Sequence, residues 1–451
     1  MQRLNDWVEA LAGWVWGVPL IILLCGTHVW MTIRTGFIQK KLPLALKLSF
    51  TKDPDAPGDV SHFGALTTAL AATVGAGNII GVGVAIAAGG PGAVLWMWLT
   101  GVFGMATKYA EALLAVKYRV VNDRGEMCGG PMVVLERGLG MKWLGMIFAV
   151  FTAIAAFGIG NMFQAKAIAG QAAEMLPDLS EPMVRSVVGI VLAVTTGAVL
   201  LGGIRSIARF CSFFVPLMVI LYILGCLYIL VANMGTVPGA IWLIITDAFS
   251  GQAVAGGALG VVIQAGIKRG LFSNESGMGS APIAAAAAKT STPGRQALVS
   301  MTGTFWDTVV VCALTGIVIV ASGAWKVEKE GSALTHEAFD HVPLIGQPLL
   351  TLGLLTFVFS TLIGWSYYGE KAIEYLGGLR FITAYRWLWV VAIYFGATMP
   401  SGLIINFADS ANGLMAVPNL ISLLLLSGVI ALETRGLKAN FPSNGAGFNR
   451  H

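Results

Sequence analysis

Two short runs of glycine interrupt apolar segments of this chain. The first, Gly75-Ala-Gly-Asn78, lies within the apolar stretch 63–90, and the second, Gly256-Gly-Ala-Leu-Gly260, lies within 253–267. At membrane depth no water satisfies the backbone groups that a broken helix releases, so a break of this kind has to line a cavity enclosed by protein. The released amides and carbonyls suit a polar solute and its ion. We therefore expect substrate contacts at Thr73, Gly75, Ala76, Gly77, Asn78, Gly256, Gly257 and Gly260.

Gln164 and Asp307 are polar residues within other apolar runs. Gln164 stands halfway along 143–175, where a neutral amide can bind a polar group without the cost of a buried charge; hydrogen bonding between helices is the alternative. Asp307 is twelve residues beyond Arg295, or about 18 Å along a helix, which places it near the membrane midplane. A carboxylate there is a functional candidate by default. It either holds an ion, faces a substrate ammonium group or pairs with Lys166.

Lys166 lies two residues beyond Gln164 and therefore points to a different face of the same helix. One reading is structural, in which the side chain reaches the membrane surface or pairs with Asp307. The other is functional: the lysine stands in for a cation or accepts protons, because a lysine removed from water loses its own proton more readily. Lys166 and Asp307 are therefore our candidates for ion coupling.

The composition identifies the elements that must position these residues as membrane helices. Hydrophobic residues make up 56% of the 451, charged residues only 11%, and the mean hydropathy is +0.77, far from the range of soluble domains. Nothing in the net charge of +5 points to nucleic acid, because basic residues collect at the cytoplasmic side of membrane proteins. The five cysteines form neither a disulfide framework nor a metal-ligand pattern.

The apolar runs predict an all-α polytopic protein with eleven transmembrane helices. The runs are 14–33, 63–90, 93–116, 143–175, 183–201, 210–231, 253–267, 296–322, 344–368, 381–399 and 403–432. We expect an external amphipathic helix at 237–249 and a polar external loop at 323–343. Acidic residues before the first run and basic residues after it predict an N-terminus outside and a cytoplasmic C-terminus. Most Lys and Arg then lie inside; the exceptions are Arg3, Arg185, Lys326 and Lys329 outside and Lys108 and Lys166 within helices.

The two breaks occupy corresponding positions. When the first helix is set aside, ten remain, and each group of five begins with an interrupted helix. Paired interrupted helices are typical of inverted-repeat secondary transporters, which hold substrate and ion between the breaks. We expect an N-terminal helix with a cytoplasmic linker at 1–60, two five-helix repeats at 61–232 and 233–432, and a cytoplasmic tail at 433–451.

Several motifs give the chain a resemblance to a known family. The segments are GALTTALAATVGAGN, GGPGAVLWMWLTGVFGMATKYAEALLAVKYR, GIGNMFQAKAIAG, KRGLFSNESGMGSAP, FWDTVVVC and NFADSANGLMAVPNL. In these segments, and over nearly its whole length, the chain resembles the alanine or glycine:cation symporter family. The resemblance implies a LeuT-like 5+5 fold in the plasma membrane. It also implies import of a small neutral amino acid by alternating access, driven by sodium or in some members by protons, without an organic cofactor.

The resemblance also implies a sodium site between the first broken helix and the run 344–368. Its ligands would be the carbonyls of Ala71, Val74 and Phe357 and the hydroxyls of Ser360 and Thr361. Phe357, Ser360 and Thr361 stand at i, i+3 and i+4, on one face of a helix. The alternative is that both hydroxyls bond back to carbonyls of their own helix.

Three further residues complete the expected site. Trp365, one turn beyond Thr361, either closes the pocket and limits side-chain size or packs in the core. Asn274 and Glu275 belong to a family motif but follow Lys268-Arg269, so we expect them in a cytoplasmic gate. If the second break is instead 270–279, they belong to the site.

Other classes of protein fit the sequence poorly. His336, Glu337 and His341 form H-E-x-x-x-H, whose i, i+5 spacing does not place both histidines on one helix face as a zinc protease requires. A passive channel does not need paired broken helices around a closed site. Protein partners are not indicated.

Overall fold

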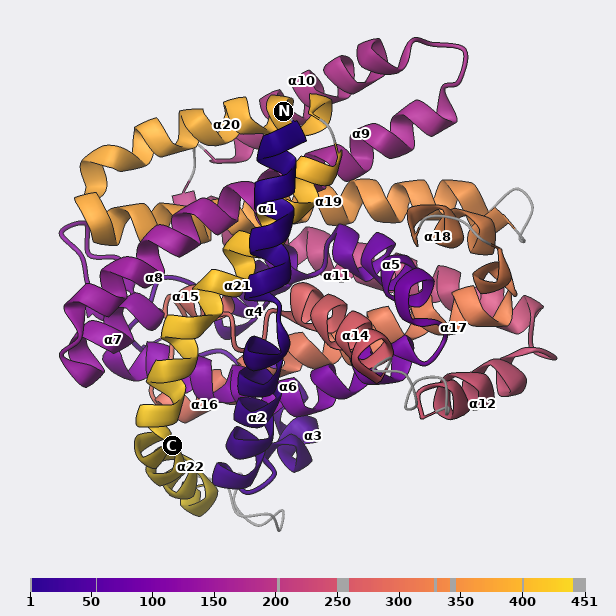
Figure 1. Cartoon of the computed structure of the whole chain (residues 1–451). Helices are drawn as coiled ribbons and strands as arrows, with labels where there is room; N and C mark the ends of the chain where they lie inside the picture. The colour runs from indigo at the N-terminus through magenta and orange to yellow at the C-terminus, as the bar shows by residue number, and fades with distance from the viewer. Residues whose placement is uncertain are drawn as a thin grey trace.

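The computed structural model describes residues 2–53, 55–200, 203–249, 259–327, 331–340, 346–399 and 401–440. These residues are almost entirely helical and form one bundle (Figure 1). A short antiparallel hairpin pairs β1 (Val120–Val121) with β2 (Met127–Cys128). The expected all-α class is therefore correct for the part of the chain that is described.

The N-terminal segment runs along the front of the bundle in Figure 1, beside α21. It comprises α1 (Gln2–Val15), α2 (Val18–Arg34), η1 (Ile38–Lys41) and α3 (Leu42–Ser49). The first two helices meet at an angle of 42°, with Gly17 at the junction and Pro19 in the first turn of α2. A proline is accepted there because that amide needs no helical acceptor. The first span therefore begins earlier than the expected 14–33 and is bent.

The first half of the remaining chain contains the first broken helix. Its elements are α4 (His62–Thr73), η2 (Ala76–Asn78), α5 (Ile80–Gly89), α6 (Ala93–Tyr118), α7 (Pro131–Leu139), α8 (Lys142–Ala155), η3 (Ala156–Met162), α9 (Phe163–Met175), α10 (Glu181–Leu200) and α11 (Gly203–Ala232). The interruption after Thr73 confirms the break expected at Gly75 to Asn78. Helices α8 and α9 continue through the π-helical turn η3 as one span of 34 residues.

The second half of the chain begins with α12, which ends beside the turn that precedes α6. Its elements are α12 (Val237–Asp247), α14 (Leu259–Asn274), α15 (Ala281–Ala285), α16 (Pro293–Thr304), η4 (Phe305–Cys312), α17 (Ala313–Ala321), η5 (Ala324–Lys326), α18 (Gly331–Asp340), α19 (Gly346–Gly377), η6 (Leu379–Phe381), α20 (Ile382–Thr398), α21 (Ser401–Leu425) and α22 (Ser427–Asn440). The segment expected as a polar loop contains α18, which packs on α5, and Thr335 Oγ1 donates to the carbonyl of Ile79 at 3.1 Å.

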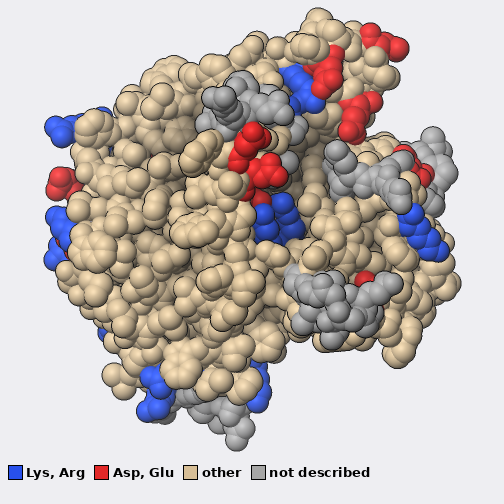
Figure 2. Space-filling model, in the orientation of Figure 1, with Lys and Arg blue, Asp and Glu red and all other residues tan. Residues whose placement is uncertain are grey.

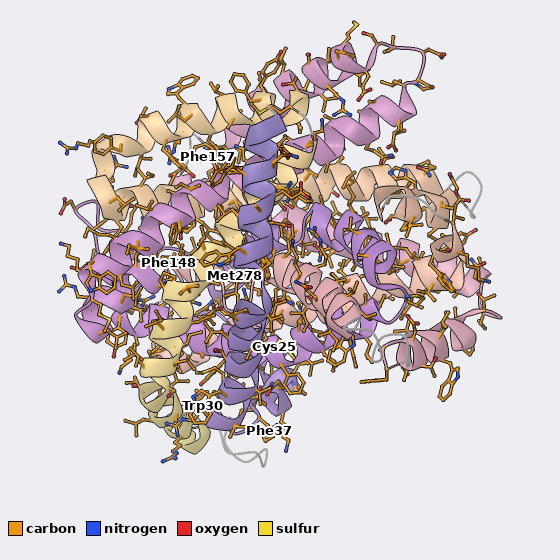
Figure 3. The ribbon with its side chains drawn as sticks, viewed as in Figure 1. Cys25, Trp30, Phe37, Phe148, Phe157 and Met278 are labelled. Atoms are coloured by element: carbon orange, nitrogen blue, oxygen red, sulfur yellow. The ribbon has the colours of Figure 1, made fainter. Side chains whose placement is uncertain are left out.

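Length and hydropathy mark the bundle as membrane-spanning. Among the described helices, five are long and apolar enough to cross a bilayer, and two bent pairs, α1–α2 and α21–α22, bring the number to seven. The halves of the broken helices are too short to count in this way. Charged residues are sparse over much of the face in Figure 2. Large apolar side chains lie on the outside, including Trp30 and Phe37 in Figure 3, as lipid contact requires.

Candidate substrate and ion site

The first break releases two carbonyl groups from helical hydrogen bonding. In an unbroken helix the amides of Gly75 and Asn78 would donate to the carbonyls of Ala71 and Val74, four residues earlier. Here the Gly75 amide donates to Asn78 Oδ1 at 2.8 Å, and the Asn78 amide donates to the carbonyl of Gly75 at 3.1 Å. The carbonyls of Ala71 and Val74 therefore lose their helical donors within the buried part of the bundle.

Glycine at position 75 lets two other helices reach this break. A Cβ atom at Gly75 would lie 2.6 Å from Thr361 Oγ1 on α19 and 3.1 Å from Gln164 Oε1 on α9. Gln164 Oε1 accepts from the Ala76 amide at 3.0 Å, and its Nε2 donates to the carbonyl of Ile159 at 3.0 Å. The structure thus places Gln164 directly at the break, where it substitutes for a helical acceptor.

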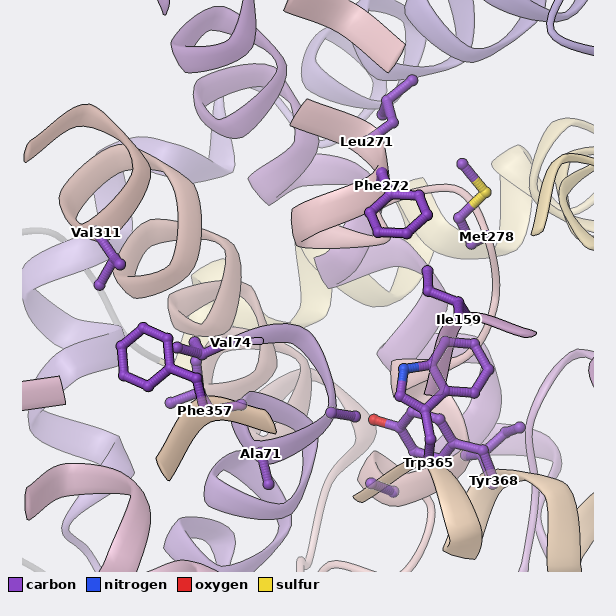
Figure 4. Close-up of a cluster of buried hydrophobic side chains, with 14 of the residues drawn as sticks. Ala71, Val74, Ile159, Leu271, Phe272, Met278, Val311, Phe357, Trp365 and Tyr368 are labelled. Atoms are coloured by element: carbon purple, nitrogen blue, oxygen red, sulfur yellow. The ribbon is translucent and has the colours of Figure 1, made fainter. Parts of the chain in front are cut away.

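The residues expected to bind sodium come together between α4 and α19. Thr361 Oγ1 lies 3.3 Å from the carbonyl oxygen of Val74, and Figure 4 shows Ala71, Val74 and Phe357 in one group. Ser360 and Thr361 also donate to the carbonyl of Phe357, each at 2.9 Å. The bonding back to the helix that we considered as an alternative is therefore present alongside the contact with Val74.

Asp307 joins three elements beside the first break. Its Oδ1 accepts from Asn78 Nδ2 at 2.7 Å, and its Oδ2 accepts from Ser273 at 2.9 Å and from Thr308 at 2.6 Å. The side chain is fully buried on the π-helical segment η4. Asp307 therefore connects η2, η4 and α14 by accepting hydrogen bonds from an amide and two hydroxyl groups.

Lys166 does not pair with Asp307. Its Nζ donates to the carbonyl of Met399, at the end of α20, at 2.6 Å. The salt bridge considered from the sequence is therefore wrong, because Lys166 lies on the side of α9 that faces α20, whereas Gln164 on the other side faces the break.

The chain is interrupted at 275–280, within the alternative position 270–279 considered for the second break. Helix α14 ends at Asn274, and the chain then takes positive φ values at Glu275 (55°), Gly277 (88°) and Gly279 (86°) before α15. These glycines adopt a backbone conformation that other residues rarely take. Of the glycines in our other placement, Gly260 lies within the first turn of α14, whereas Gly256 and Gly257 lie outside the described residues.

Asn274 and Glu275 consequently lie at the buried interruption, as expected if the second break is 270–279. Both side chains are buried, and Glu275 Oε1 accepts from Trp365 Nε1 at 3.0 Å. Trp365 itself is buried against η3, where a Cβ atom at Gly160 would lie 2.2 Å from the Trp365 Cβ. The indole therefore fills the space between the second break and η3. The segment predicted as a loop is thus the interruption after α14.

Lys268 and Arg269 were expected to mark the end of a helix, but the helix continues to Asn274. They lie within α14, where Asp409 Oδ2 of α21 is 2.7 Å from Lys268 Nζ and 3.5 Å from an Arg269 nitrogen. Asp409 is nearly fully buried. An anionic partner from a distant segment thus lowers the cost of placing two cations in the bundle.

Sequence reasoning missed Glu111. Its Oε1 accepts from the amides of Gly277 at 3.0 Å and Gly279 at 3.1 Å and from Asn419 Nδ2 at 2.7 Å. The carboxylate therefore binds the backbone that the second break releases. The available signal was a glutamate inside the apolar run 93–116, a position where a charged residue is rarely accidental.

Comparison with known proteins identifies the family to which this site belongs. The model of the sodium:alanine symporter family matches residues 1–444. The chain belongs to the sodium:alanine symporter family. The sodium/alanine symporter AgcS of Methanococcus maripaludis is 52% identical, over 95% of this chain and 96% of that protein. A probable sodium/glutamine symporter, GlnT of Bacillus subtilis, is 34% identical over 95% of this chain and 90% of its own.

A solved structure confirms the expected LeuT-like transporter fold. MhsT in complex with L-phenylalanine superimposes with a TM-score of 0.60 at 16% sequence identity, covering 84% of this chain and 98% of that one. This symporter-family chain is thus a multi-pass membrane protein and a sodium-coupled amino-acid transporter, not an enzyme. The expectation of a sodium-coupled amino-acid transporter is confirmed at that level.

Proposed function

We propose that this family member imports a small neutral amino acid, alanine or glycine, together with sodium, by alternating access. The observation that supports this most directly is the release of the Ala71 and Val74 carbonyls beside the Thr361 hydroxyl. Released carbonyls at an unwound helix are typical sodium ligands in transporters of this architecture.

The proposed sodium site uses oxygen atoms only. The carbonyls of Ala71, Val74 and Phe357 and the hydroxyls of Ser360 and Thr361 would hold the ion. A hydroxyl can rotate its hydrogen toward a carbonyl, as both do here toward Phe357, and still present a lone pair to a cation. Sodium supplies the driving force when its gradient is inward.

The proposed substrate site is the first break and its neighbours. The amides of Ala76, Gly77 and Asn78 precede α5, whose positive end favours a carboxylate, and Gly75 admits close approach. Gln164 would exchange its bond to the Ala76 amide for one to the substrate. Thr73 and Thr361 border the same break. Trp365 would restrict the site to small side chains, because it fills the space between Glu275 and Gly160.

Asp307 is the proposed second point of ion coupling. Its carboxylate, held by Asn78, Ser273 and Thr308, can take either sodium or a proton. Proton coupling therefore remains the second candidate, and the geometry favours Asp307 over Lys166, which is bonded to the end of α20.

For the membrane topology we propose the arrangement predicted from the sequence. It has eleven spans in the plasma membrane, with the N-terminus outside and the C-terminus in the cytoplasm. Residues 61–232 and 233–432 form inverted five-helix repeats, preceded by the linker region 1–60 and followed by the tail 433–451. The supporting observation is that a helix is interrupted by irregular backbone in each half, at 74–79 and at 275–280.

Uptake into proteoliposomes tests this function. Labelled alanine and glycine are supplied while a sodium gradient and a proton gradient are imposed separately. We expect an inward sodium gradient to drive accumulation above the external concentration. Stimulation by the proton gradient alone would support the second candidate, and stimulation by neither gradient would overturn symport.

A further inference from the structure

Helix α6 presents a row of residues to the second break. A Cβ atom at Gly104 would lie 2.8 Å from Ser276 Oγ, so α6 and the break touch at this level. Glu111, two turns further, accepts from Gly277 and Gly279 of the same break. Lys108 stands between them, four residues after Gly104 and three before Glu111, and side chains at these spacings share one helix face.

Lys108 is a buried cation without a hydrogen-bond acceptor among the described residues. Lys108 is only 3% exposed, and no described residue accepts a hydrogen bond from its Nζ. The ammonium lies within electrostatic range of three carboxylates, those of Glu111, Glu275 and Asp307. A buried charge is costly unless opposite charge compensates it.

The three carboxylates outnumber the ammonium. The other titratable groups that face this cluster in the described part of the chain are His28, Tyr368 and Cys312. The Nδ1 of His28 is bonded to Thr107, Tyr368 is near Glu111 and Glu275, and Cys312 is near Asp307. Asp307 is bonded to Asn78 at the first break, whereas Glu111 and Glu275 are bonded to groups of the second break and to Trp365. Lys108 thus lies on the face of α6 that packs against the second break.

We propose that Lys108 is a resident counter-cation, which neutralises the carboxylates of the second break so that transported cations are drawn to the first break and Asp307. This inference rests on the proposed symport and deepens it, since it assigns to α6 the role of limiting how many cations the site takes up. Lys108 is a positioning residue, because it acts through Glu275 and Glu111 and touches neither ion nor substrate.

The test replaces the ammonium and follows thermal stability against pH in detergent. With Lys108→Met, the buried carboxylates lack their cation and the folded state takes up a proton that the unfolded state does not bind. Stability then rises as pH falls, by up to about tenfold in the folding equilibrium per pH unit. We expect the melting temperature of Lys108→Met to rise from pH 8 to pH 5.5 more steeply than that of the wild type. Lys108→Arg, which keeps the charge, should retain the wild-type profile.

A second variant distinguishes charge from packing. In Lys108→Met/Glu275→Gln one carboxylate is removed with the ammonium, so the steep pH dependence should disappear. A parallel profile for Lys108→Met and the wild type, or no effect of Glu275→Gln on the single variant, would overturn the proposal. If Lys108→Met yields no monodisperse protein, recovery of a monodisperse peak in the double variant supports the proposal and failure to recover it contradicts it.

Transport in the same preparations separates this inference from the proposed function. Absence of sodium-driven uptake by the wild type would refute the proposed symport without changing the stability profiles. Wild-type uptake together with parallel stability profiles would refute the role of Lys108 alone.

Discussion

At the scale of single residues, two side chains replace hydrogen bonds that the broken helix has lost. Gln164 accepts from the Ala76 amide, and Thr361 contacts the Val74 carbonyl, so each compensates the backbone at one side of the same break. Both are uncharged. A neutral side chain can give up such a bond to a substrate or an ion without leaving a buried charge behind.

Replacing Thr361 by valine keeps the shape of the side chain and removes its oxygen. We expect the sodium concentration for half-maximal uptake to rise about tenfold, or ~1.4 kcal/mol. Thr356→Val is the matched control, because this threonine lies on the exposed side of α19 and bonds only its own helix carbonyls at Leu352 and Gly353. Equal sodium dependence in both variants would contradict the proposed ion site.

Removal of the Gln164 amide should weaken substrate binding. In Gln164→Ala the substrate loses the amide group that would exchange its bond to Ala76 for one to the substrate, and we expect the apparent affinity for alanine to fall at least tenfold, about 1.4 kcal/mol. Binding is measured by competition with labelled alanine on purified protein. Gln171→Ala is the control, since Gln171 lies two turns along α9 and bonds Thr351. Unchanged affinity in Gln164→Ala would show that the substrate contact lies elsewhere.

At the scale of elements, the site is made by helices that stop and restart. The first break needs Gly75 because α9 and α19 approach its Cα, and the second needs positive φ values at Gly277 and Gly279. Glu111 stabilises the second break from α6 by accepting from two of its amides. Each broken helix therefore depends on a neighbour from another part of the chain.

Gly75→Ala tests the close approach at the first break. The added Cβ would lie 2.6 Å from Thr361 Oγ1, so α4 and α19 have to separate, and we expect sodium-driven uptake to fall more than about tenfold. Gly81→Ala is the control on α5, because nothing lies within 4 Å of its added Cβ. Both are assayed for uptake at matched protein yield. Full activity of Gly75→Ala would exclude a tight junction here.

The ion pairs between α14 and α21 should contribute strongly to stability. Asp409→Asn leaves Lys268 and Arg269 without their buried anion, and loss of one partner of a buried pair costs about 3–5 kcal/mol. We expect a lower melting temperature in detergent. Glu433→Gln removes the partially exposed partner of Lys117 and should cost only about 0–1 kcal/mol. Similar melting temperatures for the two variants would contradict this assignment.

At the scale of the whole molecule, the bundle brings distant segments to one place. The break at 74–79, Gln164 of α9, Asp307 of η4 and Thr361 of α19 meet although they are far apart in sequence. Helix α18 packs on α5, beyond the first break, and hydrogen-bonds Ile79. The site is therefore enclosed by both halves of the chain, as the proposed alternating access between them requires.

The orientation of the bundle can be tested by labelling in intact cells. Single cysteines are introduced as Asp178→Cys, between α9 and α10, and Arg435→Cys, in α22. With the N-terminus outside, a membrane-impermeant maleimide should label position 178 before lysis and position 435 only after lysis. The wild type, with its five native cysteines, gives the background. The reverse labelling pattern would invert the proposed topology.

The membrane class, most of the apolar spans, the family and the first break could all be predicted from the amino-acid sequence. They follow from composition, from motifs and from glycines next to Asn78 in an otherwise apolar run, which are local properties of the chain. The position of the second break required the folded structure. Glycines occur at both 256–260 and 270–279, and Lys268-Arg269 resembles a helix end until Asp409, on α21, is seen to compensate the two charges. Whether a charged residue can lie inside the membrane depends on its partner in space, and a partner from a distant part of the chain leaves no mark on the local pattern.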